Sequence, residues 1–237
     1  MKLSQNGGIT QFLPVVSEFL PLFLLVIPQP FVCHSGPVGV APGRFVLGPV
    51  AFFFLLINNQ PNRATLAAAA GAVGGSIEDS TGRTGDHVYE MRHAAERVRA
   101  AVEASRSLPF PFTLTARAEN HIVGRPDLKD TIRRLQAYQE AGADVLYAPG
   151  LVSRDEIHAV VSSVDRPVNV IMGIAGMQLT YTDLSTLGVR RISVGSALAR
   201  VALGAFLRAA REMLEHGTFT FANEAASFRE LNEIFKS

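Results

Sequence analysis

Two acidic residues follow directly after a short apolar run in the first half of the chain. Residues 72–77 lead into Glu78 and Asp79, and small polar residues and glycines continue to Gly85. In a parallel α/β architecture, ligands bind at the carboxyl ends of strands, because the loops there vary while the sheet holds them in place. The acidic pair therefore predicts a site at this strand end. A second interpretation is structural, with Asp79 or Ser80 capping the next helix.

A second polar cluster follows the next predicted strand. Residues 112–117 end at Arg117, and Glu119, Asn120 and His121 come shortly after it. In one parallel sheet these side chains share an edge with the acidic pair. Since histidine titrates near neutral pH, His121 is a candidate acid or base at that edge.

Helices alternate with short apolar runs from residue 61 onward, at spacings that suit βα units. Strands are predicted at 73–78, 112–117, 144–147, 167–172 and 191–194. Helices are predicted at 63–70, 88–105, 127–141, 153–163, 182–187, 196–216 and 223–235. Asp127 and Ser153 stand where two of these helices begin, and Gly142 stands at the end of one. Strand–helix units in a row imply a parallel sheet with covered faces, so the predicted fold class is α/β.

The charges of the chain are unevenly spread. Residues 1–60 carry three, on Lys2, Glu18 and Arg44, whereas the following residues carry the other 40 of the 43. The net charge of +1 argues against a protein that binds nucleic acid through charge. The single cysteine, Cys33, excludes an internal disulfide framework and a multi-cysteine zinc site.

Two apolar runs lie within the weakly charged part, at 19–27 and 46–57. Both are shorter than a membrane-spanning helix, and prolines interrupt or bound them. We therefore expect a cytoplasmic protein. The other interpretation is a membrane-associated protein held by residues 19–57.

Five segments taken together resemble the isocitrate lyase and phosphoenolpyruvate mutase superfamily. They are GGSIED at 74–79, TARAEN at 115–120, AGAD at 141–144, PVN at 167–169 and RISVG at 191–195. The resemblance runs from about Arg63 to the C-terminus. It implies a (β/α)8 TIM barrel, an oligomer of dimers that exchange a C-terminal helix, and bound Mg²⁺. The implied reaction cleaves or rearranges a C–C or P–C bond in a small oxo- or hydroxy-carboxylate through an enolate-like intermediate.

The resemblance also assigns roles to single residues. Glu78 matches a glutamate of the Mg²⁺ site, Arg117 matches the arginine that holds the substrate carboxylate, and Asn169 is similar to an asparagine that contacts substrate in some lyases. A cation and a guanidinium suit an enolate, because its oxygen and its carboxylate are negative. Gly195 lies where many barrels bind ligand. The structural alternatives are a helix cap for Glu78, an ion pair of Arg117 with Glu78 or Glu119, a buried backbone contact for Asn169 and a tight turn at Gly195.

Some residues of the superfamily pattern are missing. Its main metal ligands are aspartates on an early strand, yet no aspartate precedes Asp79. The cysteine that isocitrate and methylisocitrate lyases use as a proton donor is absent after this residue, and residues 148–150 read APG where subgroups carry a histidine or glutamate. With Glu78 as a lone carboxylate, Mg²⁺ binding is expected to be weak. The prediction is a mutase- or lyase-like enzyme with an unassigned carboxylate substrate.

Five strand–helix units do not close an eight-stranded barrel, and residues 1–60 are too short for three more at about 30 residues each. We interpret residues 1–60 as an atypical, apolar, proline-rich segment that stems from a shifted reading frame, a wrong start or a recombined gene. Residues 61–237 are then a barrel portion with C-terminal helices, incomplete in its N-terminal third. The alternative to an enzyme is a catalytically inactive relative that acts as an oligomer partner.

Overall fold

The computed structural model describes residues 32–33, 54–56, 62–85 and 87–236. The strands of this part form one sheet in the order β1-β7-β6-β5-β4-β3-β2. They are β1 (Val32–Cys33), β2 (Phe54–Leu56), β3 (Gly74–Glu78), β4 (Thr113–Arg117), β5 (Val145–Tyr147), β6 (Val168–Ile171) and β7 (Arg191–Ser193). Neighbours from β2 to β7 are parallel, whereas β1 is antiparallel to β7. The predicted α/β class with a parallel sheet is confirmed.

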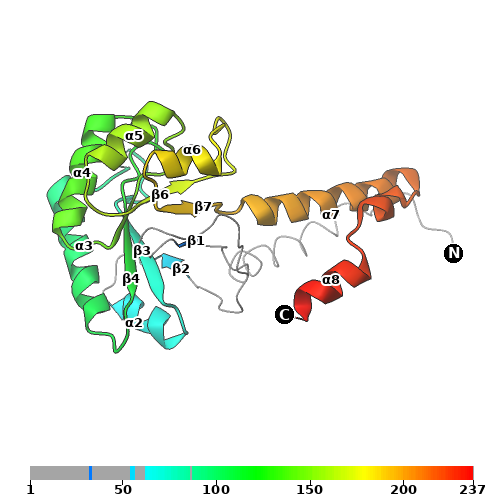
Figure 1. The fold of residues 1–237 in the computed structure, drawn as a ribbon, viewed down its shortest axis with the longest axis horizontal. Coiled ribbons are helices and arrows are strands. Elements are labelled where there is room, and N and C mark those ends of the chain that lie inside the picture. Colours follow the sequence, from blue (N-terminus) through cyan, green and yellow to red (C-terminus); the bar gives the residue numbers. More distant parts are fainter. Residues whose placement is uncertain (1–31, 34–53, 57–61, 86, 237) are drawn as a thin grey trace. The chain divides into compact units, whose positions relative to one another are not determined.

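Helices follow the parallel strands in the predicted alternation. They are α2 (Asn62–Ala69), α3 (Met91–Arg106), α4 (Leu128–Glu140), α5 (Arg154–Ser162), α6 (Tyr181–Thr186), α7 (Ala197–His216), the 3-10 helix η1 (Thr220–Glu224) and α8 (Phe228–Phe235). The chain divides into two compact units, one with the sheet and α2–α6, the other with α7, η1 and α8. In the first unit, α3, α4 and α5 lie along one side of the sheet (Figure 1).

Two predicted helix bounds are wrong, for local reasons. The helix predicted from residue 88 begins at Met91, because Val88 pairs with Ser80 in an isolated bridge and the Glu90 carboxylate accepts the backbone N–H groups of Arg92 and His93. The helix predicted at 223–235 is divided into η1 and α8. Its second part begins after Ser227, whose hydroxyl accepts from the Glu230 N–H. The predicted start at Asp127 is confirmed by its bond from the Asp130 N–H.

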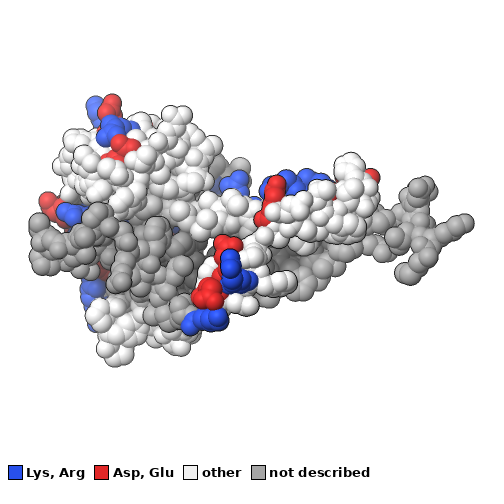
Figure 2. Space-filling model, turned by 45° about the vertical axis from the view of Figure 1, so that its right-hand side comes forward, with Lys and Arg blue, Asp and Glu red and all other residues white. Residues whose placement is uncertain are grey.

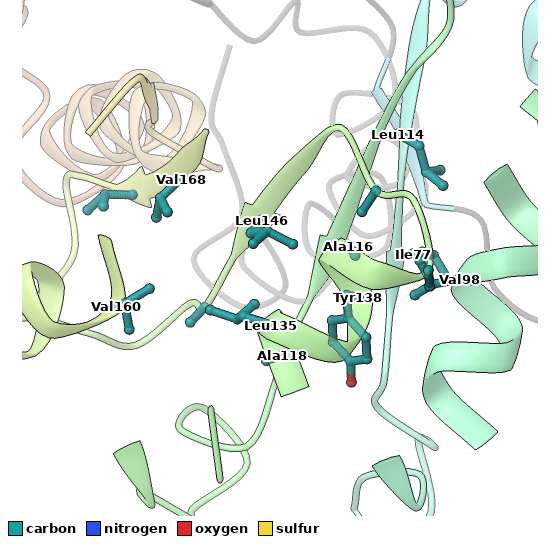
Figure 3. Close-up of a cluster of buried hydrophobic side chains, with 14 of the residues drawn as sticks. Ile77, Val98, Leu114, Ala116, Ala118, Leu135, Tyr138, Leu146, Val160 and Val168 are labelled. Atoms are coloured by element: carbon teal, nitrogen blue, oxygen red, sulfur yellow. The ribbon is translucent and has the colours of Figure 1, made fainter. Parts of the chain in front are cut away.

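The hydrophobic core lies between the sheet and the helices. Strand residues alternate between the two faces of a sheet, so every second side chain of β3, β4 and β5 points toward the helices. Figure 3 shows this cluster, in which strand side chains meet side chains of α3, α4 and α5. Its labelled members are buried: Ile77, Val98, Leu114, Ala116, Ala118, Leu135, Tyr138, Leu146, Val160 and Val168. Burying each large apolar side chain stabilises the fold by about 1.5–3 kcal/mol. The core thereby holds the strands of the sheet in place.

The barrel is open within the described residues, since β1 and β2 end the sheet on opposite sides. Residues 1–60 contribute only these two short strands to the described part. The other predictions for this segment, including its origin and its membrane association, lie outside the described residues. Among the described helices, none is both long and apolar enough to cross a membrane. The cytoplasmic location stays a prediction.

Candidate functional site

One row of side chains crosses five strands on the face opposite the helices. Glu78 pairs in register with Arg117, Arg117 with Tyr147, Tyr147 with Asn169, and Asn169 with Arg191. Register partners in parallel strands point to the same side of a sheet, so the five side chains share one face. The first three are the last residues of their strands. The row therefore lies toward the carboxyl edge, where parallel α/β sheets bind ligands.

Arg117 is the centre of the charged part of this row. Its Nη2 lies 3.3 Å from Oε2 of Glu78, and its Nε donates to Oε1 of Glu119 at 2.6 Å. The guanidinium carbon is 5.0 Å from the centre of the Tyr147 ring. Burial opposes the charge, but the carboxylates of Glu119 and Glu78 outweigh it and hold the pKa of Arg117 above its ordinary value. Both ion pairs that the sequence predicted as alternatives, with Glu78 and with Glu119, are present in the structure.

Glu119 is the acidic residue of this cluster that is most easily protonated. Its side chain is only 3% exposed. Burial raises the pKa of Glu119 to about 7, and the nearby carboxylates of Glu78 and Asp79 add to the rise while Arg117 opposes it. Near neutral pH this carboxyl group can therefore take up or release a proton next to Arg117.

The acidic pair divides between the two faces of the sheet. Whereas Glu78 faces Arg117, Asp79 points toward the helices, where its side chain is 1% exposed. Its Oδ2 accepts from Arg134 Nη1 at 3.0 Å and from the Tyr138 hydroxyl at 2.6 Å. Its Oδ1 accepts the backbone N–H of Glu119 at 2.8 Å. The helix-cap interpretation is thus wrong for Asp79, which instead ties the loop after β4 to helix α4.

Asn169 carries an unsatisfied acceptor. Its Nδ2 donates to Oγ of Ser193 at 3.0 Å, and its Oδ1 is buried with no hydrogen-bond partner among the described residues. A buried polar atom of this kind is uncommon and is often explained by water or a ligand. The predicted alternative, a contact with a buried backbone group, is wrong, because the amide donates to the side chain of Ser193. Ser193 also forms a side-chain hydrogen bond with Tyr147, whose pKa burial raises to about 12.

Arg191 reaches across the polar face from β7 to β4. Its Nη1 donates to Oγ1 of Thr115 at 2.7 Å, although β5 and β6 lie between β4 and β7 in the sheet. Thr115 precedes Arg117 by two residues on the same face, farther from the carboxyl edge. The Arg191 side chain therefore reaches from its own place in the row across this face to β4.

Two further predicted residues lie in turns and loops. Gly195 has φ of +50°, and a Cβ added there would lie 3.1 Å from Cδ1 of Ile171, so the tight turn favours glycine. A ligand contact at Gly195 stays a prediction. His121 has a buried Nε2 with no partner among the described residues, and its Cβ lies against Gly150.

A magnesium site is not supported by these residues. Within the described ranges, no group of three or more His, Cys, Asp or Glu could hold a metal ion. Mg²⁺ prefers octahedral oxygen ligands, and the guanidinium of Arg117 beside Glu78 opposes a second cation there. The donor set does not fit Mg²⁺, and the role of Glu78 as a ligand stays a prediction.

The sequence alone did not single out Tyr147, Ser193, Arg191 or the burial of Glu119. A usable signal existed for the first, because Tyr147 ends its strand as Glu78 and Arg117 end theirs. The spacing of residues along the chain does not predict a side chain such as that of Arg191, which crosses from β7 to β4.

Comparisons with known proteins agree with this architecture. Residues 57–214 match the family model described as phosphoenolpyruvate phosphomutase. An oxaloacetate decarboxylase of Bradyrhizobium diazoefficiens (strain JCM 10833 / BCRC 13528 / IAM 13628 / NBRC 14792 / USDA 110) is 32% identical over 119 residues, which are 48% of this chain and 39% of the decarboxylase. The chain thus spans well under half of that relative.

Solved structures show the same relationship. A chain described as a lyase/mutase from Burkholderia cenocepacia J2315 is 58% identical with a TM-score of 0.71, and the match covers 75% of this chain and 64% of that one. A phosphonopyruvate hydrolase in complex with oxalate and Mg²⁺ is 26% identical with a TM-score of 0.62, and the match covers 74% of this chain and 63% of that one. The resemblance noted from the sequence motifs is confirmed.

Proposed function

Because this chain belongs to the phosphoenolpyruvate phosphomutase family, we propose that it binds a small oxo- or hydroxy-carboxylate at Arg117 and acts on it as a lyase- or mutase-type enzyme. The reaction breaks or rearranges a C–C or P–C bond and leaves negative charge on an enolate-like fragment. One observation carries the proposal: the guanidinium of Arg117 lies in a row of polar side chains at the carboxyl edge of the sheet. Related proteins include an oxaloacetate decarboxylase and a phosphonopyruvate hydrolase that was solved with oxalate.

The residues around Arg117 suit such a ligand. Arg117 offers a planar fork of donors that matches a carboxylate, and Arg191 adds a second positive charge from the same register row. Fixed charges and dipoles of this kind stabilise the charge that develops on an enolate. Asn169 and Ser193 supply an amide and a hydroxyl beside the same space. Arg117 therefore holds the ligand, and the other three orient it.

Mg²⁺ takes part in the reaction that the family resemblance predicts. In this chain the described carboxylate at the matching position is Glu78, which is paired with Arg117. We therefore expect weak Mg²⁺ binding and assign the stabilisation of the enolate charge to Arg117 and Arg191.

An activity assay with matched variants tests the proposal. Oxaloacetate and phosphonopyruvate are offered to the full chain, and pyruvate formation is followed by a coupled reaction. We expect Arg117→Met to lose about 100-fold or more of kcat/KM, as is typical when one essential electrostatic contact is removed. Arg92→Met is the control, because the Arg92 side chain on α3 is 86% exposed. No turnover of either compound by the unmodified chain, or equal losses in both variants, contradicts the proposal.

A second candidate is a catalytically inactive relative that pairs with another subunit through its C-terminal helices. The observation in its favour is the apolar surface of α8, where Phe228 is 87% and Phe235 84% exposed. Exposed apolar groups of this size commonly mark protein interfaces. Light scattering tests the pairing: Phe228→Asp together with Phe235→Asp yields a monomer if α8 pairs subunits, and leaves the mass unchanged if it does not. The two candidates differ in turnover, which the activity assay measures.

On the face drawn in Figure 2, basic and acidic side chains lie beside one another. The described residues of this face therefore do not gather into a patch of one sign. The half-buried guanidinium of Arg117 is therefore a better candidate than this surface for recognising a ligand through charge.

A further inference from the structure

Arg117 is already bound by two carboxylates of its own chain. Glu119 holds Nε at 2.6 Å, and Glu78 lies 3.3 Å from Nη2. Both acidic side chains are largely buried, with exposed fractions of 3% for Glu119 and 15% for Glu78. An entering carboxylate thus meets a guanidinium whose charge is opposed by two negative groups.

A third anion at this guanidinium is electrostatically unfavourable. Like charges repel strongly in a buried environment, because little water screens them. The repulsion is relieved when one of the three carboxylates is neutralised or leaves. Of the chain's own two carboxylates, Glu119 is the more deeply buried, and a buried ionised group is the more readily neutralised.

We propose that Glu119 competes with the ligand for Arg117, and that one proton from solvent is taken up at the Glu119 carboxylate with each carboxylate ligand that binds. This inference rests on the proposed carboxylate-binding function and adds a proton-coupled specificity determinant to it. The neutral carboxyl group can then stay beside Arg117 and donate its O–H to the ligand carboxylate, while the ligand takes over the charged contact.

The surroundings of Glu119 agree with this role. Burial raises the pKa of Glu119 to about 7, so the proton is available near neutral pH. The charged and titratable groups that face it come from β3, β4 and β5, and through Asp79 from α4. They are Glu78, Asp79, Arg117, Tyr147, Arg134 and Tyr138. Asp79 also accepts the backbone N–H of Glu119. This bond fixes the backbone of Glu119, and its side chain extends from there to Arg117.

Calorimetry with oxalate tests the inference on the full chain. Oxalate stays ionised across the range used, so changes in affinity report on the protein. Titrations at about pH 6 and about pH 8, each in two buffers of different ionisation enthalpy, give both Kd and the number of protons taken up. We expect Kd to rise about tenfold between the two pH values and about one proton to be taken up at the higher one.

Two variants separate this role from others. Glu119→Gln, a neutral residue of the same shape, is expected to bind oxalate with a Kd independent of pH and without proton uptake. His121→Asn is the control for the histidine on the same loop, and it is expected to keep the pH dependence.

The outcomes distinguish the inference from the proposed function. Oxalate binding by the unmodified chain that does not change with pH and takes up no proton overturns the inference alone. Loss of binding in Glu119→Gln at both pH values also overturns it, because Glu119 would then position Arg117 and not compete for it. If neither the unmodified chain nor Glu119→Gln binds oxalate at either pH, the proposed carboxylate-binding function is overturned, and the inferred competition falls with it.

Discussion

The replacement Asp79→Ala tests how the loop after β4 is held to helix α4. Asp79 accepts three hydrogen bonds, from Arg134, Tyr138 and the backbone of Glu119, and is 1% exposed. Its removal leaves a guanidinium that is 6% exposed without one of its carboxylates, which in buried pairs costs about 3–5 kcal/mol. Arg134 keeps its bond to Asp130 at 2.7 Å, so the lower half of that range, about 3–4 kcal/mol, is expected.

Urea denaturation followed by circular dichroism measures this loss. Asp155→Ala is the matched control, because Asp155 is an exposed residue in the first turn of α5. The control is expected to change the free energy of unfolding by about 1 kcal/mol or less. A loss below about 1 kcal/mol for Asp79→Ala would refute the reasoning, since it would mean that the three bonds add no net stability.

Three further predictions concern single positions. The folded-state pKa of Glu119 is raised to about 7 from an ordinary 4.5, so ionisation favours the unfolded chain. Between these two pH values the free energy of unfolding of the unmodified protein should therefore fall by about 3 kcal/mol relative to that of Glu119→Gln, and above them the difference should stay constant. Parallel pH curves of the two urea midpoints would contradict this. Gly150→Ala should destabilise by about 2–3 kcal/mol, because its Cβ would lie 2.9 Å from Cγ2 of Ile122 at φ of +95°, whereas Gly124→Ala, with open space at φ of +82°, should cost about 1 kcal/mol. Equal losses in the two glycine variants would show that the close contact is relieved without cost. Calorimetry should find no saturable Mg²⁺ site at millimolar metal, and tight binding that Glu78→Gln abolishes would restore the metal to the site.

Much of the fold from residue 61 could be predicted, because each βα unit carries local signals. Short apolar runs indicated the strands, and side chains such as Asp127 indicated helix starts. The start of α3 was wrong because its cap is the carboxylate of Glu90, a residue that is an uncommon cap, while Val88 is held in a bridge with Ser80.

The candidate site could be predicted in part. Glu78, Arg117 and Asn169 do share one register row, although Asn169 is the second residue of β6 and not its last. The division of the acidic pair follows from the two-residue period of a strand, which places Glu78 and Asp79 on opposite faces.

What could not be predicted depends on tertiary distance. The bond from Arg191 to Thr115 joins residues 76 positions apart, and the pKa of Glu119 depends on its burial and on Glu78 and Asp79, which belong to another strand end. Neither leaves a local pattern in the sequence.

A crystal structure of the chain with oxalate tests the central claim most directly. The account predicts an oxalate carboxylate against the guanidinium of Arg117, beside Tyr147 and Asn169, at the carboxyl edge of the sheet. Oxalate bound elsewhere, with Arg117 still held by both Glu78 and Glu119, would contradict it.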